Sequence, residues 1–273
     1  MSVTEEGEVK GGPVVGTLGL GMGLGGMAQA PIRQVQVVLL RHAHSLGQAA
    51  GKHERKTSPH LVDAALSPLG LEQAKELRAF VGEQPLPDVL VVVSPLTRAL
   101  QTAVIAFDGL VPRDKFIVTP EVAEVDSSHH HSIPENRGRP LHEVTADERV
   151  GLGAVREMDL SRVQAHGWPE SHNASGVETR RSHAKGGRVA RHARRPGETW
   201  FWLATLPADR IVVVSHCNWI LRAVNDRDAP GATRNLLSYV DNATPLSVTL
   251  TSLPNGSVDW SLSDQVHGWF LRG

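Results

Sequence analysis

The stretch that decides the fold reads VQVVLLRHAHS over residues 35–45. Its first six residues are mostly valine and leucine, a composition typical of a strand that is buried on both faces. The apolar run stops at Arg41, and His42 and His44 follow it. Ligands of an open parallel sheet bind outside the carboxyl ends of its strands. The stretch therefore predicts such a sheet, with chemically active residues directly after its first strand.

The same arrangement recurs twice later in the chain. Residues 88–93 and 210–214 indicate two more buried strands, and SPLTR and SHCN follow them. One such cluster alone is compatible with an ordinary solvated loop. Three clusters at one sheet edge bring together two arginines and two histidines, namely Arg41, Arg98, His42 and His216. Because arginines and helix N-termini are suited to hold a phosphate, the sequence predicts a phosphoryl-group site.

Serine–proline pairs mark the starts of two predicted helices. Ser67 is the expected N-cap, and Pro68 the first residue, of a helix that ends at Gly82. The second pair, at 94–95, predicts the same kind of start for a helix that ends near Phe107. The two helices would follow the first polar cluster and the second buried strand.

The order of elements predicts an α/β fold. Residues 115–118 indicate a short strand, and residues 247–251 and 257–262 indicate a hairpin at a sheet edge. Strands that alternate with helices predict three layers, with helices on both faces of a mostly parallel central sheet. Residues 121–200 are polar, and we expect them to form a helical and loop insertion over the C-terminal edge of the strands.

The first 33 residues differ from the rest in composition. Residues 11–26 are rich in glycine and carry no charge, so ordering them costs much backbone entropy for few packing contacts. We expect residues 1–33 to be a disordered tail and residues 34–273 to form the catalytic domain. The pattern G-x-G-x-x-G at 21–26 follows no predicted strand and is interpreted as a chance match rather than a dinucleotide site.

Composition narrows the class of partner. The formal net charge is −1, which gives no global attraction to nucleic acid or to an anionic membrane. Cys217 is the one cysteine, so neither an internal disulfide nor a cysteine-based zinc site can form. The apolar runs are too short to span a bilayer. We therefore expect a cytoplasmic protein that binds a small molecule, with no nucleic-acid or membrane partner.

Four short motifs occur in order along the chain. They are RHA at 41–43, LSPLGLEQA at 66–74, SPLTRALQTA at 94–103 and VSHC at 214–217. In this order they resemble the motifs of the histidine phosphatase superfamily, also called the phosphoglycerate mutase-like family. The resemblance covers residues 35 to about 225 and is weak in the middle. Ala43 and Cys217 stand where the family usually has glycine.

The resemblance implies a phosphatase that works through a phosphohistidine formed on His42. Arg41, Arg98 and His216 would surround the phosphoryl oxygens and stabilise charge during transfer. Ser45 and Gln48 occupy about the positions of two further phosphate-binding residues of the family. No metal or other cofactor is implied, because the cationic side chains supply the electrostatic stabilisation. Cys217 is expected to be a small buried residue rather than a reactive thiol.

A carboxyl group must donate a proton to the leaving alcohol and later take one from water. In the family that the sequence resembles, this acid is a Glu or Asp shortly after the third strand along the chain, which here is the short strand at residues 115–118. Glu124 is our preferred candidate, because it stands where the family has a Leu-x-Glu pattern. Glu121 and Asp126 remain alternatives on the sequence alone.

The substrate cannot be assigned from the insertion. The histidines at 129–131 are adjacent in a predicted loop, and we interpret them as solvated rather than metal-binding. Residues 180–195 are rich in arginine without acidic residues, so they form either a solvated face or a region that attracts a polyanionic substrate. Sugar phosphates, other phosphorylated metabolites and phosphoproteins remain open.

Two other functions compete with the phosphatase. One is a phosphoglycerate mutase, which the resemblance also includes, although the residues after Glu124 do not match the family's mutases. The other is a non-catalytic module that binds a phosphorylated ligand or a protein. The presence of both histidines and both arginines favours a working enzyme.

Overall fold

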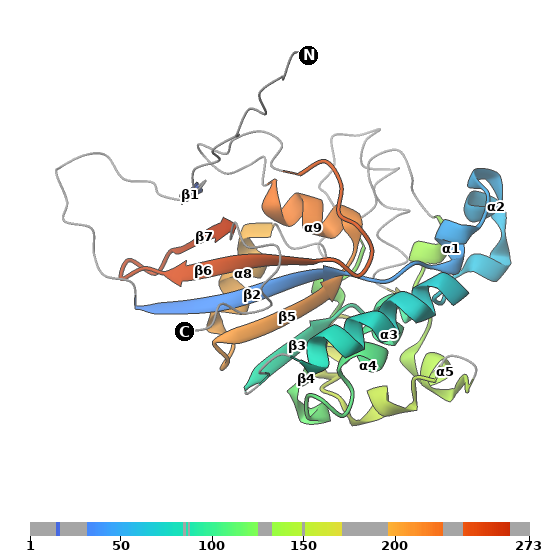
Figure 1. Ribbon diagram of the computed structural model, residues 1–273, viewed down its shortest axis with the longest axis horizontal. Helices are drawn as coiled ribbons and strands as arrows, with labels where there is room; N and C mark the ends of the chain where they lie inside the picture. The colour runs from blue at the N-terminus through green and yellow to red at the C-terminus, as the bar shows by residue number, and fades with distance from the viewer. Residues whose placement is uncertain are drawn as a thin grey trace, which may run out of the picture.

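Seven strands of the described residues form one sheet, in the order β1-β7-β6-β2-β5-β3-β4 (Figure 1). The computed structural model describes residues 15–16, 32–83, 86, 88–124, 133–148, 151–170, 196–225 and 237–262. The strands are β1 (Val15–Gly16), β2 (Arg33–Arg41), β3 (Val89–Val93), β4 (Phe116–Val118), β5 (Arg210–Ser215), β6 (Pro245–Ser252) and β7 (Val258–Leu262).

The sheet combines a parallel half with an antiparallel half. Strands β2, β5, β3 and β4 run parallel to one another, and β6, β7 and β1 continue the sheet antiparallel beyond β2. The parallel strands are the buried valine-rich runs that the sequence predicts. The predicted hairpin is confirmed as β6–β7, although β6 lies inside the sheet between β2 and β7 rather than at an edge.

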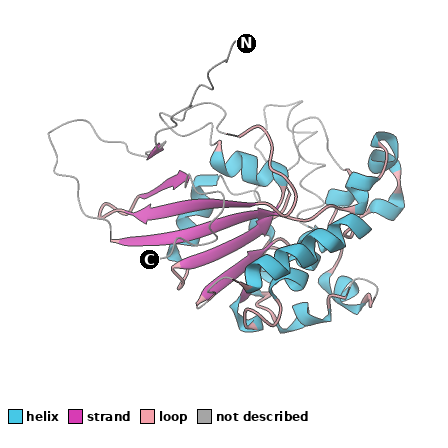
Figure 2. Cartoon of the chain, in the orientation of Figure 1, coloured by secondary structure: helices cyan, strands magenta, loops and turns pink. Residues whose placement is uncertain are grey.

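Helices cover both faces of the sheet, which confirms the predicted three-layer α/β fold (Figure 2). Side chains alternate between the faces along each strand. Val38 and Leu40 therefore join the core that α3 (Pro68–Gly82) and α4 (Thr97–Phe107) cover. The residues between them, such as Val37 and Leu39, face the other side of the sheet. They join the core that α8 (Pro196–Thr205) and α9 (Cys217–Val224) cover.

Helix α3 begins as its sequence predicts. Pro68 is its first residue, and Ser67 is the N-cap whose Oγ accepts a hydrogen bond from the backbone N–H of Gly70 at 3.2 Å. A Cβ added at Gly70 would lie 1.9 Å from the carbonyl oxygen of His44. The glycine in this motif therefore allows α3 to approach the loop that follows β2.

Helix α4 begins differently from the prediction, at Thr97 and without a side-chain bond from its N-cap residue, Leu96. The carboxylate of Asp63 takes over the capping, because it accepts bonds from the N–H of Thr97 at 2.8 Å and from its Oγ1 at 2.6 Å. The Oγ of Ser94 instead lies 2.8 Å from His216 Nε2. The expectation that Ser94 caps α4 is wrong, because a buried carboxylate from another segment provides the stronger acceptor.

Short helices and turns connect the strands and the longer helices. After β2 come α1 (Leu46–Ala49), α2 (Lys52–Thr57) and η1 (Pro59–Leu61), and before β4 comes η2 (Arg113–Lys115). The insertion contains η3 (Pro120–Val122), η4 (Pro134–Asn136), α5 (Leu141–Ala146), η5 (Gly153–Glu157) and α6 (Ser161–Ala165). The described part of the insertion thus consists of short helices and turns joined by loops.

Much of the described insertion lies beside the sheet rather than over the strand ends. Val144, Val155 and Val163 pack into the core that α4 covers, and Asp159 bridges to β4. Glu124, Ile133 and the turn η4 are the parts of the described insertion that reach the pocket described below. Residues 125–132 and 171–195, which include the three adjacent histidines and the basic run, lie outside the described residues.

Two residues of the predicted N-terminal tail belong to the sheet. Val15 and Gly16 pair antiparallel with Ser261 and Trp260 of β7. Strand β2 begins at Arg33, next to the expected domain start. Residues 1–14 and 17–31 lie outside the described residues, so their disorder stays a prediction. Within the described part of the chain, every helix is too short or too polar to cross a bilayer.

Candidate active site

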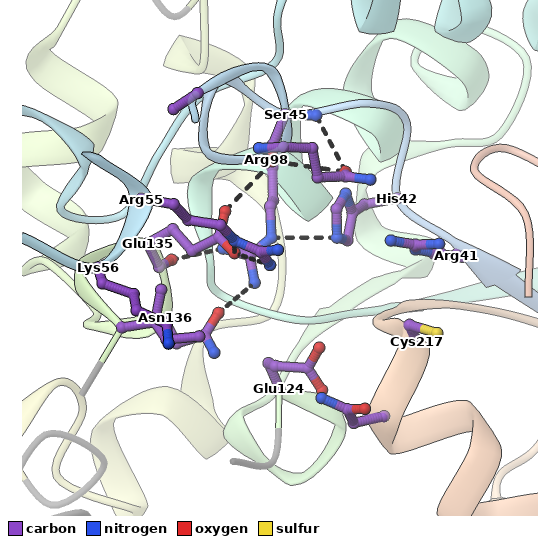
Figure 3. A pocket seen from close by; sticks show the side chains of 14 residues that line it. Arg41, His42, Ser45, Arg55, Lys56, Arg98, Glu124, Glu135, Asn136 and Cys217 are labelled. Atoms are coloured by element: carbon purple, nitrogen blue, oxygen red, sulfur yellow. Dashed lines mark hydrogen bonds and ion pairs between the residues drawn. The ribbon is translucent and has the colours of Figure 1, made fainter. Parts of the chain in front are cut away.

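A pocket with a volume of about 480 Å³ lies at the carboxyl ends of the parallel strands (Figure 3). The end of β2, the first turn of α4 and the start of α9 contribute to it, as the three polar clusters of the sequence predict. Its lining consists of Arg41, His42, Ser45, Gln48, Ala50, Arg55, Lys56, Arg98, Glu124, Ile133, Glu135, Asn136, Cys217 and Asn218.

The hydrogen bonds of His42 fix its tautomer. Its Nδ1 lies 2.7 Å from the carbonyl oxygen of Ala43. A carbonyl oxygen only accepts, so Nδ1 carries the proton and Nε2 keeps its lone pair. Nε2 accepts a hydrogen bond from Nε of Arg98 at 3.1 Å. The nitrogen with the lone pair is thus the one beside the arginine.

His42 is held in its neutral form. The side chain is buried, with 4% of its surface exposed. Burial lowers the pKa of His42 well below the ordinary value of 6.5, and the guanidinium groups of Arg98 and Arg41 lower it further. The bond to Ala43 raises this pKa and offsets only part of the effect. At neutral pH the imidazole is therefore an uncharged nitrogen base.

Arg98 is bonded on all three of its side-chain nitrogens. Besides the bond to His42, Nη1 donates to the carbonyl oxygen of Glu135 at 2.5 Å, and Nη2 donates to Oδ1 of Asn136 at 2.9 Å. Each Nη keeps a second N–H for another acceptor. The turn η4 therefore holds the guanidinium in one orientation while leaving donors for a ligand.

Arg41 lies on the other side of His42 in Figure 3. Its Nη1 donates to the carbonyl oxygen of Val240 at 2.6 Å, and its guanidinium stacks over the ring of Tyr239 at 5.1 Å. Among the described residues, none accepts a hydrogen bond from its buried Nε. A buried, unsatisfied guanidinium donor beside a pocket suits an anionic ligand.

Motif residues outside the pocket hold the loop that carries His42. The N–H of Ala43 donates to Oγ1 of Thr102 at 3.0 Å, and the N–H of His44 donates to Oε1 of Gln73 at 2.9 Å. The N–H of Leu66 donates to Oε1 of Gln101 at 2.7 Å. These bonds explain why Gln and Thr stand at fixed places in the second and third motifs.

The candidate acids lie in different environments. Glu124 lines the pocket, and its Oε1 accepts a hydrogen bond from the backbone N–H of Trp219 at 3.2 Å. Glu121 does not line the pocket: its buried carboxylate holds Nη2 of Arg162 at 2.6 Å. Asp126 lies outside the described residues. The geometry favours Glu124 over Glu121.

Ser45 and Gln48 reach the pocket as parts of a capping box. The Oγ of Ser45 accepts from the N–H of Gln48 at 3.1 Å, and Oε1 of Gln48 accepts from the N–H of Ser45 at 3.1 Å. Nε2 of Gln48 also donates to Oδ1 of Asn242 at 2.9 Å, and Nδ2 of Asn242 donates to the carbonyl oxygen of His42. Gln48 thus also secures the loop of His42.

His216 and Cys217 differ from their expected surroundings. The imidazole of His216 is fully buried, and its ring centroid lies 5.0 Å from that of His42. It is close to His42 but is not among the residues that line the pocket. Cys217 was expected to be buried and is instead partly exposed in the pocket wall, because α9 begins there.

Residues 37–149 match the family model described as histidine phosphatase superfamily (branch 1). This part of the chain is therefore similar to members of the histidine phosphatase superfamily. The match includes the end of β2 with Arg41, the following His42, and also Arg98 and Glu124. It leaves α8, β5 and α9 outside, so the placement of His216 rests on the structure and on the motif at 214–217.

Known proteins resemble the chain over different lengths. A phosphoglycerate mutase-like protein of Arabidopsis thaliana is 36% identical over 42% of this chain and 45% of its own length. The chain therefore matches less than half of that relative. Two solved structures have low overall similarity to it. The product of an open reading frame of Mycobacterium tuberculosis is 18% identical, with a TM-score of 0.46 over 86% of this chain and 99% of that chain. Mycobacterial glucosyl-3-phosphoglycerate phosphatase is 20% identical, with a TM-score of 0.43 over 84% of this chain and 97% of that chain.

Four pocket residues were missed by the motif analysis. Arg55 and Lys56 come from α2, and Glu135 and Asn136 come from η4. Arg55 donates from Nε to Oε1 of Glu135 at 2.6 Å. The sequence shows these residues only as charged and polar positions in loop-like segments, so no pattern marks them. Among the described residues, no group of His, Cys, Asp and Glu side chains is arranged to hold a metal ion.

Proposed function

We propose that this chain is a metal-independent phosphomonoesterase that works through a phosphohistidine intermediate on His42. Its substrate would be a small phosphorylated molecule whose phosphoryl group lies between His42, Arg41 and Arg98. The observation that carries the proposal is the tautomer of His42: Nδ1 is committed to the carbonyl of Ala43, and the lone pair on Nε2 lies beside Arg98. Such a nitrogen is a nucleophile in the correct protonation state.

In the first step, Nε2 of His42 attacks phosphorus, and the bond between phosphorus and the leaving oxygen breaks. Glu124, in its protonated form, gives its proton to the leaving oxygen, so that a neutral alcohol departs. The free N–H groups of Arg98 and the guanidinium of Arg41 stabilise the phosphoryl oxygens. Their positive charge is the reason why the proposed reaction needs no metal.

In the second step, water attacks the phosphorus of the phosphohistidine. Glu124, now a carboxylate, takes a proton from this water, and the bond between phosphorus and Nε2 breaks. His42 recovers its lone pair, and inorganic phosphate leaves. The lowered pKa of His42 keeps the leaving imidazole neutral, so each cycle ends in the state from which it began.

The proposal is tested by the turnover of phenyl phosphate in EDTA, with wild type, His42→Ala and His44→Ala. We expect His42→Ala to lose at least about 10⁴-fold in kcat, since the covalent route is removed. His44→Ala is the matched control, because His44 is the neighbouring histidine and its Nδ1 contacts Ser67 Oγ at 2.8 Å. Turnover that persists in His42→Ala, or that EDTA abolishes, would refute the mechanism.

The role of Glu124 is tested separately with two leaving groups. Glu124→Gln should slow hydrolysis of an alkyl phosphate by about 10²–10³-fold and that of nitrophenyl phosphate much less, because a good leaving group needs no proton. Glu121→Gln removes a carboxylate that pairs with Arg162 and should affect both substrates alike. Equal sensitivity of both substrates to Glu124→Gln would assign the acid elsewhere.

The assay also separates the two alternatives. The names of the Arabidopsis relatives make a mutase the second candidate. A mutase would convert one phosphoglycerate isomer into another with little release of phosphate. A binding module would hold inorganic phosphate without turnover of any substrate.

A further inference from the structure

Trp219 contacts the proposed acid without lining the pocket. It is the third residue of α9, is buried, and is not among the residues of the pocket wall. Its backbone N–H donates to Oε1 of Glu124 at 3.2 Å, and its indole Nε1–H donates to the carbonyl oxygen of Glu121 at 2.8 Å. One buried residue therefore holds both ends of the segment 121–124, whose last residue is the acid.

The backbone between these two bonds is fixed from both sides. Ser215 Oγ, at the end of β5, donates to the carbonyl oxygen of Val122 at 2.7 Å. On the other side, the carboxylate of Glu121 holds Nη2 of Arg162, which belongs to α6, at 2.6 Å. The chain is thus held in place up to the acid, and the freedom that remains is that of the acid's own side chain.

The bond from Trp219 restricts that side chain. A proton transfer needs the carboxyl group within about 2.6–3.2 Å of the reacting oxygen, and a free glutamate side chain loses conformational entropy when it is ordered there. The first N–H groups of a helix have no acceptor within the helix, so they are available to a carboxylate. Figure 3 shows the carboxyl group of Glu124 on the side of the pocket where α9 begins at Cys217. The N–H of Trp219 therefore favours one orientation of the acid at the pocket wall.

We propose that Trp219 is a positioning residue, which holds Glu124 in the orientation that transfers protons to the leaving oxygen and from water. The indole bond to Glu121 sets where the N–H of Trp219 lies relative to the acid. The inference rests on the proposed function, because it assumes that Glu124 is the acid. Because Trp219 acts only through Glu124, removal of its indole N–H should slow only those substrates whose leaving oxygen needs a proton.

The kinetic test uses Trp219→Phe, which removes the indole N–H and keeps an aromatic ring. We expect kcat to fall about 10-fold for an alkyl phosphate and less than about 2-fold for nitrophenyl phosphate. In the Glu124→Gln background the same change should have almost no further effect, because the group through which it acts is already lost. Trp200→Phe is the matched control, since it removes another buried indole N–H, which donates to the carbonyl oxygen of Ala223 at 3.1 Å. This control should leave the ratio of the two rates unchanged.

The outcomes separate this inference from the catalytic proposal. No loss in Trp219→Phe, an equal loss for both substrates, or a loss that persists in the Glu124→Gln background would overturn the positioning role. The proposed function would still stand in each of these cases if hydrolysis requires His42.

Amide hydrogen exchange, measured by NMR, tests the contact without turnover and with Trp219 intact. In Glu124→Ala the amide of Trp219 should exchange at least about 10-fold faster than in wild type, since its acceptor is gone. The amide of Ile220, which donates to the carbonyl oxygen of His216 at 2.9 Å, is the internal reference and should change little. An unchanged rate at Trp219 would overturn the inference. A faster rate in a protein that hydrolyses nothing would support the positioning of Glu124 and refute the phosphatase.

Discussion

The two sides of the pocket are built in different ways. On the strand side, His42, Arg41 and Arg98 are buried, and backbone carbonyls or fixed side chains hold each of them. On the α2 side, Arg55 is only partly buried and depends on a single carboxylate, Glu135. The strand side suits a reaction that tolerates little displacement, whereas the α2 side suits recognition, which can change without disturbing the chemistry.

The largest expected effect lies on the strand side. Arg98→Lys keeps the charge but loses the forked donors, so the bond to His42 and the two bonds to η4 cannot all form. We expect kcat/KM for phenyl phosphate to fall by about 10³-fold. Arg55→Lys, the same change on the α2 side, should cost less than about 10-fold with this substrate. Losses of similar size in the two variants would remove the contrast between the two sides.

An intermediate effect is expected at Asp63, which supports the strand side from a distance. Asp63→Asn keeps one acceptor for Thr97 but loses the other and the charge that faces Arg139. Asparagine tolerates the positive φ of 48° at this position, so the backbone adds little strain. We expect urea denaturation to show a loss of about 2 kcal/mol in the free energy of unfolding, and kcat/KM to fall about 10-fold because α4 positions Arg98.

The control for this change is Asp209→Asn. Asp209 is largely exposed and pairs with Arg33 at 2.9 Å, far from the pocket. Exposed ion pairs of this kind contribute less than about 1 kcal/mol. If both variants lose the same stability and neither loses activity, Asp63 is not a positioning residue for Arg98.

The smallest effect is the pH dependence of stability that His42 produces. Its folded-state pKa is lower than its unfolded value, so the unfolded chain binds the proton first as the pH falls below about 6.5. The stability that the neutral imidazole contributes is therefore present above that pH and is lost as the pH falls toward the folded-state pKa. His42→Asn lacks this loss. Its stability relative to wild type, measured in urea, should rise from about pH 8 to about pH 5, and a constant difference would contradict the account.

The strand side of the site could be predicted from sequence because its residues follow buried strands. An apolar run such as residues 35–40 predicts both the strand and the residue at which it ends. Parallel strands bring their carboxyl ends to the same edge of the sheet. This logic found His42, Arg41 and Arg98. It could not find Asp63 as the cap of α4, because Ser94-Pro95 offers a local cap and the true acceptor comes from a distant loop.

The α2 side could not be predicted for a related reason. Arg55 and Glu135 are 80 residues apart, and each looks like an ordinary surface charge until the fold brings them together. Gly47 shows the same limit, since its need for a small side chain comes from Glu135 packing over it. For the acid, sequence position favoured Glu124, but only the ion pair of Glu121 with Arg162 gave a physical reason to prefer it.

The most direct test is to trap the phosphoryl-enzyme. Wild type would be mixed with phenyl phosphate, quenched in alkali within milliseconds and digested for mass spectrometry. The account predicts one phosphorylated peptide, with the phosphoryl group on His42, stable in alkali and lost in acid, and absent from His42→Asn. A phosphoryl group on another residue such as Cys217, or rapid turnover with no phosphorylated peptide, would contradict the central claim.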